Sequence, residues 1–168
     1  MLLYLIRHGI ALERATADVP EPQRPLTADG QRRMRQNVRG LHRLGVQIDN
    51  IWTSPLLRAR QSADILAAEF SLTRALREQP ALQPLADVAL IIELLRKEPR
   101  QGRIALVGHE PHLGQLATFL LTGLNLNAVE FKKGGIASIE IDRFRRPIRG
   151  RLLWLLTPRH LRRIRKPD

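Results

Sequence analysis

Two histidines of this sequence each follow a short apolar segment, where an imidazole could do chemistry. Leu2–Ile6 runs into Arg7-His8-Gly9, and the similar segment 103–107 runs into Gly108-His109. Apolar runs of this length, bounded by glycine, are typical of buried strands. The carboxyl ends of parallel strands line the ligand crevice of an open sheet, so we expect both imidazoles at one site. A histidine there can act as nucleophile or base, with Arg7 holding an anion beside it.

A third segment adds another cation. Ser54-Pro55 is typical of a helix start, with Ser54 as the N-cap and the proline in the first turn. Arg58 follows near this N-terminus, where backbone N–H groups favour anions, although alone it would be interpreted as an exposed helix arginine. With Arg7, His8 and His109 it predicts a phosphoryl pocket, in which one imidazole attacks phosphorus while the other cations stabilise its oxygens. Fixed cations make a metal unnecessary, and we expect no cofactor.

Alternating strand and helix patterns must position these residues. They predict a three-layer α/β/α fold with a mostly parallel sheet and a C-terminal antiparallel hairpin at its edge. The predicted strands are Leu2–Ile6, Asn50–Thr53, Ala75–Gln79, Arg103–Gly108, a half-exposed Ile136–Ile141 and Gly150–Leu156, the last two joined by a turn over Arg143–Pro147. The predicted helices run from Thr27 to Gly45, from Ser54 to Phe70, from Leu85 to Pro99 and from Glu110 to Gly123.

Composition indicates an ordinary globular chain. Its 168 residues, 43% hydrophobic and 26% charged, predict one domain over residues 1–158, followed by a basic C-terminal tail, 159–168, that is frayed or disordered. No apolar run is long enough to cross a membrane, and we expect no membrane partner. With no cysteine the chain can form neither a disulfide nor a sulfur-based zinc site. We expect a cytoplasmic monomer.

The charge is less ordinary, because 28 Lys and Arg against 16 Asp and Glu give a net charge of +12. Such an excess could attract nucleic acid, a polyanion or an acidic protein, or it could be a solvated face. Only 4% of residues are aromatic, so no base-stacking platform is evident and we expect no nucleic acid. All predicted pocket residues precede Gly123, so deleting Arg159–Lys166 is expected to leave the kinetics unchanged.

The set of motifs resembles the histidine phosphatase superfamily. Arg7-His8-Gly9, Ser54-Pro55 with Arg58, and Gly108-His109 carry the resemblance in order and spacing. Arg24-Pro25-Leu26-Thr27 and Gln83-Pro84 are similar to its small phosphohistidine phosphatase branch, the SixA type. The resemblance extends to about Trp154 and implies a phosphoglycerate mutase-like fold.

This resemblance implies a metal-independent phosphatase that removes a phosphoryl group from phosphohistidine on a protein. His8 would be the nucleophile and carry the phosphoryl group, with Arg7, Arg58 and His109 holding its oxygens. Arg24, Gly9 and Ser54 would contribute to substrate binding. Many members place a glutamate as general acid before the third helix, where this chain has Pro80-Ala81-Leu82-Gln83. The acid is therefore unassigned among Glu13, Asp18 and Asp87. Hydrolysis of phosphohistidine tolerates the lack of an assigned general acid, because its imidazole leaves more easily than an alkoxide.

Other interpretations remain open at this point. The substrate could be a small phosphate ester or a polyphosphate-like anion, and a polyanion-binding module or an inert domain is less consistent with the complete motif set. A metal site from His8, His109 and His112 is not supported, because His109-Glu110-Pro111-His112 lacks the i, i+4 spacing that chelation on one helix face uses. His42 and His160 are interpreted as surface residues.

Overall fold

The structure, a computed structural model, describes residues 1–13, 19–99, 102–143 and 148–165. Its strands are β1 (Leu2–Arg7), β2 (Asn50–Thr53), β3 (Leu76–Glu78), β4 (Arg103–Gly108), β5 (Ile136–Arg143) and β6 (Arg149–Leu156). Its helices are α1 (Ala28–Arg43), α2 (Leu57–Glu69), α3 (Val88–Leu95), α4 (His112–Thr122) and α5 (Pro158–Leu161), with 3-10 turns at Glu21–Gln23, Thr73–Ala75 and Pro80–Leu82.

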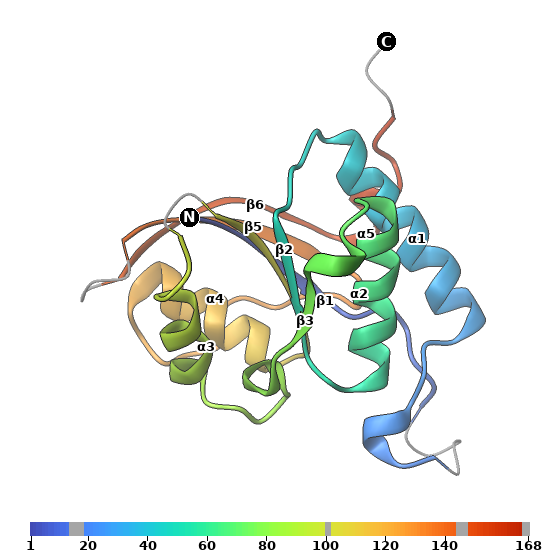
Figure 1. The fold of residues 1–168 in the computed structure, drawn as a ribbon, viewed down its shortest axis with the longest axis horizontal. Coiled ribbons are helices and arrows are strands. Elements are labelled where there is room, and N and C mark those ends of the chain that lie inside the picture. Colours follow the sequence, from blue (N-terminus) through green and yellow to red (C-terminus); the bar gives the residue numbers. More distant parts are fainter. Residues whose placement is uncertain (14–18, 100–101, 144–147, 166–168) are drawn as a thin grey trace.

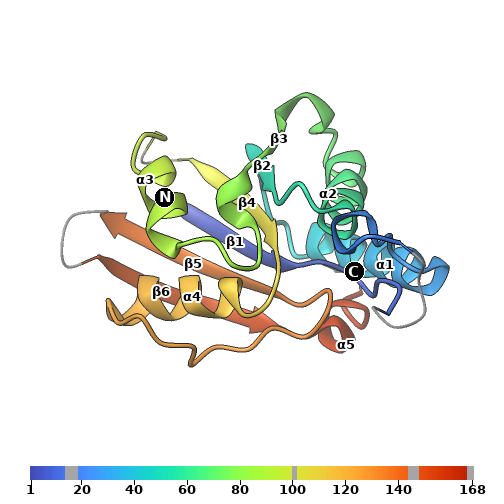
Figure 2. The same cartoon turned by 90° about the horizontal axis from the view of Figure 1, so that it is seen from below.

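The strands form one sheet in the order β3-β2-β4-β1-β5-β6. Helices α3 and α4 cover one face, and α1, α2 and α5 cover the other (Figures 1 and 2). Strands β1 to β4 pair in parallel, whereas β5 and β6 are antiparallel additions next to β1. The predicted three-layer α/β/α fold with its edge hairpin is confirmed.

Strand β1 is buried on both faces of the sheet, as its continuous apolar sequence predicts. Leu3 and Leu5 pack in the core beneath α3 and α4, while Tyr4 and Ile6 pack in the core beneath α1 and α2. Arg7 at the end of β1 pairs with Gly108 at the end of β4. The two histidines that follow, His8 and His109, therefore lie side by side at the carboxyl ends of these two strands.

Three helices begin later than the sequence predicts, and the last of them, α4, starts at His112 instead of Glu110. Ser54 continues the strand, since its N–H donates to the Val107 carbonyl at 3.0 Å, so α2 starts only at Leu57. The Ser54 hydroxyl accepts from Leu56 N–H at 3.3 Å but is not the N-cap of the helix. The third helix starts at Val88 instead of Leu85, because the Asp87 carboxylate caps it by accepting from Ala89 N–H at 2.9 Å. Leu85 lies outside the helix and is 95% exposed.

The C-terminal region is packed more tightly than the sequence predicts. Strand β5 is not half-exposed: Ile136 to Ile139 are all buried, because β5 lies between β1 and β6 and both faces are covered. The segment after Pro158 is not a frayed tail from its start, since Leu161 on α5 is fully buried against α1. Gly40 permits this contact, because a Cβ there would lie 2.0 Å from the Leu161 carbonyl oxygen.

Three predicted features involve residues outside the described ranges: most of the β5–β6 turn (144–147), the candidate acid Asp18, and the end of the tail (166–168). Within the described ranges no helix is long and apolar enough to span a lipid bilayer.

Candidate active site

A cleft of about 380 Å³ opens where β1 and β4 end. Its wall contains both predicted imidazoles, four cations and three carboxylates: His8, His109, Arg7, Arg24, Arg58, Lys133, Glu13, Glu21 and Glu110. The structure thus brings together five predicted residues from four separate points of the sequence: Arg7 with His8, then Arg24, Arg58 and His109. The cationic excess and the position at the carboxyl edge suit the cleft to an anionic ligand.

The His8 imidazole is held in one tautomer by its neighbours. Its Nδ1 lies 2.6 Å from the Gly9 carbonyl oxygen, and its Nε2 lies 3.3 Å from Arg58 Nε. A carbonyl only accepts and a guanidinium only donates, so the proton resides on Nδ1 and the lone pair on Nε2. Gly9 is itself fixed, since its N–H donates to Ser62 Oγ at 3.0 Å. Gly9 therefore orients the imidazole through its backbone.

The second imidazole, His109, lies beside the first. Its ring centroid is 5.0 Å from that of His8, and its Nε2 is hydrogen-bonded to Ser54 Oγ at 2.8 Å. Ser54, predicted to contribute to substrate binding, contacts His109 directly. The Ser54 hydroxyl thus serves the neighbouring imidazole and the turn into α2, and it is not the predicted N-cap.

Both imidazoles are electrically neutral at physiological pH. The pKa of His8 is lowered to about 3, mainly by burial; the hydrogen bond to Gly9 opposes this shift, and the charges of Arg58, Arg7 and Lys133 add to it. Burial also lowers the pKa of His109 to about 2, with added repulsion from His8 and Arg58. The His8 Nε2 lone pair is therefore available as a nucleophile without prior deprotonation.

These depressed pKa values predict a loss of stability in acid. The unfolded chain takes up a proton on His8 below its ordinary pKa of 6.5, whereas the folded chain does so only near 3, so protons favour unfolding between these values. We expect His8 alone to cost about 3 kcal/mol of unfolding free energy between about pH 7 and pH 4. Urea unfolding at both pH values measures this loss.

The matched measurement uses a variant that cannot titrate at this position. His8→Ala should lose about 3 kcal/mol less than the wild type over the same interval, whatever its stability at neutral pH. Equal losses in the two proteins would show that the His8 imidazole titrates normally in the folded state.

Arg58 is buried, and its guanidinium contacts His8 and Glu21. Besides the His8 contact, one terminal nitrogen donates to the Glu21 carbonyl at 3.1 Å and the other lies 2.9 Å from Glu21 Oε1. The same carboxylate binds Arg24, whose Nε lies 2.6 Å from Glu21 Oε2. Arg24 also donates to the Leu12 carbonyl. Glu21 thus holds Arg58 of α2 and Arg24 of the entry loop, the segment between β1 and α1 that carries Glu21 and Arg24, in place. The sequence analysis did not predict this role.

Arg7 is anchored by donating to the Phe131 carbonyl, while its Nε has no hydrogen-bond partner in the part of the chain that the structure describes. That buried N–H remains available to an anion in the cleft. Lys133 also lines the cleft, although the sequence analysis did not predict it as a site residue. The expectation that all pocket residues precede Gly123 is therefore wrong, because residues 131–134 return to the end of β1, where Gly134 N–H donates to the His8 carbonyl at 2.9 Å.

The carboxylates proposed as general acid are separated by the structure. Glu13 lines the cleft, Asp87 is occupied as the cap of α3, and Asp18 lies outside the described residues. Ala81, near the position of the glutamate in many superfamily members, is buried in the core. Glu110, which the sequence reasoning assigned only to a helix start, also lines the cleft, and burial raises the pKa of its carboxyl group.

The histidines outside the cleft differ in their surroundings. His42 and His160 are exposed, as predicted. His112 is fully buried on α4 and does not line the cleft. Across residues 1–13, 19–99, 102–143 and 148–165, no three His, Cys, Asp or Glu side chains are grouped as metal ligands.

The fold and the cleft together define an α/β protein suited to binding a phosphoryl-like anion beside a neutral imidazole. Residues 3–83 match the histidine phosphatase superfamily (branch 1). An uncharacterized protein of Picosynechococcus sp. is 36% identical over 141 residues, which cover 83% of this chain and 84% of that protein. Phosphohistidine phosphatase SixA of Escherichia coli (strain K12) is 28% identical over 164 residues, covering 96% and 97%.

A solved structure is similar to this chain over nearly its whole length. The structure of the protein histidine phosphatase SixA complexed with tungstate matches with a TM-score of 0.84 at 26% identity, over 96% of this chain and 99% of that chain. The chain belongs to the histidine phosphatase superfamily, and to its SixA-type branch. It is a phosphatase with the phosphoglycerate mutase-like fold.

Proposed function

We propose that the protein removes the phosphoryl group from phosphohistidine on a partner protein, through a phosphoryl intermediate on His8. The observation that carries this proposal is the His8 imidazole itself. It is neutral, its proton is fixed on Nδ1 by Gly9, and its Nε2 lone pair faces Arg58 in a cationic cleft. A nucleophile that needs no base and a site that needs no further cation both favour phosphoryl transfer.

In the proposed reaction, Arg58 moves its Nε–H from His8 Nε2 to a phosphoryl oxygen as the substrate binds. The Nε2 lone pair then forms a bond to phosphorus while the P–N bond of the substrate breaks, and the departing imidazole takes up a proton from solvent water, which the attacking water returns in the second step. Arg7, Arg58 and His109 stabilise the oxygens as charge redistributes. Water attacks the phosphoryl-His8 in the second step, which releases inorganic phosphate and restores neutral His8.

Phosphohistidine is favoured over a phosphate ester by the leaving group and by the relatives. The loop in which many superfamily members place a glutamate holds buried Ala81 here, so proton delivery is less securely provided than an alkoxide leaving group would require. The E. coli relative is named as a phosphohistidine phosphatase. With four cations around the cleft, we also propose that the reaction needs no metal ion.

A substrate panel assayed with excess chelator tests this function. The purified protein should hydrolyse a phosphohistidine peptide faster than a sugar phosphate, a nucleotide or polyphosphate, by about tenfold or more in kcat/KM. The fixed cations should keep this rate unchanged when divalent ions are removed. A preference for the ester or for polyphosphate would identify a small-anion phosphatase instead. Activity restored by one divalent ion would contradict the metal-free mechanism.

A further inference from the structure

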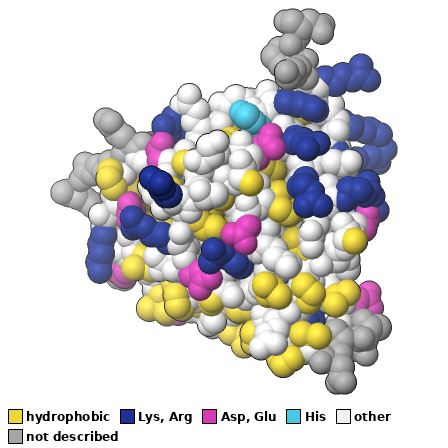
Figure 3. Space-filling model, turned by 45° about the vertical axis from the view of Figure 1, so that its right-hand side comes forward, with side chains coloured by type: hydrophobic (Ala, Val, Ile, Leu, Met, Phe, Trp, Pro, Cys, Tyr) yellow, Lys and Arg dark blue, Asp and Glu magenta, His cyan; other side chains and the backbone are white. Residues whose placement is uncertain are grey.

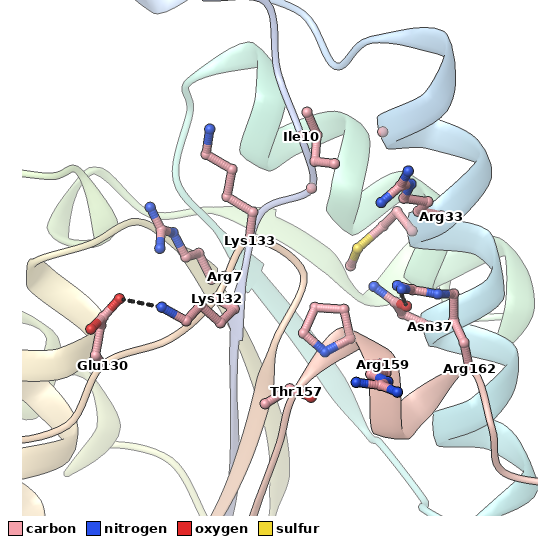
Figure 4. A pocket seen from close by; sticks show the side chains of 14 residues that line it. Arg7, Ile10, Arg33, Asn37, Glu130, Lys132, Lys133, Thr157, Arg159 and Arg162 are labelled. Atoms are coloured by element: carbon pink, nitrogen blue, oxygen red, sulfur yellow. Dashed lines mark hydrogen bonds and ion pairs between the residues drawn. The ribbon is translucent and has the colours of Figure 1, made fainter.

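A second hollow, here called the basic groove, lies next to the catalytic cleft and has a volume of about 650 Å³ (Figure 4). One wall is α1, which contributes Arg33, and the opposite wall is the loop that carries Lys132 and Lys133. The third side is formed by Arg159 on α5 and by Arg162 just beyond it. The supposed C-terminal tail thus forms part of a surface built from three segments far apart in the sequence.

The basic groove is strongly cationic. Six of its fourteen lining residues are basic, counting Arg7 with the five just named, and one, Glu130, is acidic. Glu130 pairs with Lys132 at 3.1 Å, and Arg33 pairs at 2.6 Å with Asp29, which does not line the groove. Among the described residues, Lys133 and Arg159 have no ion-pair partner. On the face in Figure 3, Lys and Arg side chains gather near the C-terminal end.

Part of this cationic wall is held in position. Arg162 donates to Asn37 Oδ1 at 3.1 Å, and buried Asn37 in turn donates to the Gly134 carbonyl at 3.2 Å. Leu161, between the two groove arginines, is fully buried against α1. The arginines therefore belong to the folded body and cannot be treated as a solvated end.

The basic groove is continuous with the site of chemistry. Arg7 and Lys133 line both the groove and the catalytic cleft. A chain that places a phosphoryl group against His8 can therefore extend its neighbouring residues over Arg33 and Arg159. No aromatic side chain is found among the fourteen lining residues, so the groove offers acidic groups charge but offers nucleobases no stacking surface.

We propose that the basic groove binds an acidic segment of the phosphoprotein substrate, next to the phosphohistidine. This inference rests on the proposed function. The cations stand on separate elements, α1, the 132–133 loop and the α5 region, and this spacing suits carboxylates distributed along a polypeptide better than one compact ion. Binding at this groove lowers KM for such proteins and leaves the chemical step to the cleft.

Two synthetic peptides test the proposal. Each has one phosphohistidine, flanked on both sides by glutamates in the first peptide and by glutamines in the second. The wild type should show an approximately tenfold lower KM for the glutamate peptide at low salt. This preference should shrink at physiological ionic strength, where the Debye length is about 8 Å. Fluorescence anisotropy of the unphosphorylated, labelled peptides measures the same preference without any chemistry.

A pair of charge-matched variants locates the preference. Arg33→Gln with Arg159→Gln removes two charges from the groove and should reduce the preference about fivefold. Arg35→Gln with Arg163→Gln removes the same charge from exposed positions on α1 and beyond α5 that do not line the groove, and it should keep the preference. Circular dichroism and thermal unfolding verify that both variants are folded.

The outcomes separate this proposal from the proposed function. Equal KM and equal binding for the two peptides in the wild type would overturn the groove proposal, as would equal losses in both variants, which would reflect net charge alone. If neither peptide is dephosphorylated while a phosphate ester is, the proposed function fails. The anisotropy measurement then still decides whether the groove binds acidic peptides.

Discussion

Replacing His8 with alanine is expected to reduce turnover by about 10⁴-fold or more, because the variant has no atom that can accept the phosphoryl group. His109 lies 5.0 Å away ring to ring, with its Nε2 hydrogen-bonded to Ser54 Oγ, and in the proposed reaction it holds the phosphoryl oxygens, so we do not expect it to replace His8. The measurement is kcat on a phosphohistidine peptide. In the wild type, rapid acid-free quenching and peptide mass spectrometry should locate an acid-labile, alkali-stable phosphoryl group on His8.

The control is His42→Ala, which removes an exposed imidazole on α1 that takes no part in the cleft. That variant should retain wild-type turnover and the phosphoryl intermediate. Substantial activity in His8→Ala would contradict the covalent mechanism, and so would a phosphoryl group found on another residue. Thermal unfolding of both variants separates a chemical loss from a folding loss.

The strands that position the site could be predicted from the sequence, because buried parallel strands appear as short apolar runs bounded by glycine. β1 and β4 are short, apolar and bounded by glycine, and their carboxyl ends meet at one edge in any open parallel sheet. Arg7, His8 and His109 follow from that rule. Arg58 could be placed because Ser54-Pro55 marks the entry to a helix, even though α2 itself begins at Leu57.

The remaining parts of the site lie in segments with no periodicity to interpret. Glu21 lies in a proline-containing loop, and its pairing with Arg24 and Arg58 depends on how that loop folds back over the strand ends. Lys133 reaches the cleft only because residues after α4 return to the end of β1. Local sequence has no signal for such contacts, since they are set by the tertiary path of the chain.

For the C-terminal segment, the prediction from sequence fails for a different reason. Leu161 is an apolar residue set among arginines, so its surroundings in sequence predict a solvated end. It is buried because Gly40 lets α5 approach the backbone of α1. The expectation that deleting Arg159–Lys166 leaves the kinetics unchanged has therefore lost its basis. The deletion would remove Leu161 from the core and Arg159 and Arg162 from the basic groove.

Arg58→Ala is expected to reduce kcat/KM for a phosphohistidine peptide by about 10²-fold or more, as when one preorganised donor is removed from an anion-stabilising site. The loss has two sources: the guanidinium no longer stabilises the phosphoryl oxygens, and His8 Nε2 loses the donor that orients it at 3.3 Å. Arg58→Lys keeps the charge but has one ammonium where three nitrogens now make contacts, so it should recover the rate only partly.

Arg60→Ala is the matched control, because Arg60 lies on the same helix but is only partly buried and pairs with Asp64 and Glu78 away from the cleft. It should retain wild-type kinetics. Comparing kcat with KM assigns the defect: stabilisation confined to the transition state lowers kcat and kcat/KM together, whereas a loss of simple anion binding raises KM alone. We expect the first pattern, because Arg58 contacts the nucleophile itself. Near-normal rates in both Arg58→Ala and Arg58→Lys would exclude Arg58 from phosphoryl transfer and leave its buried contacts with Glu21 as a structural tie between α2 and the entry loop.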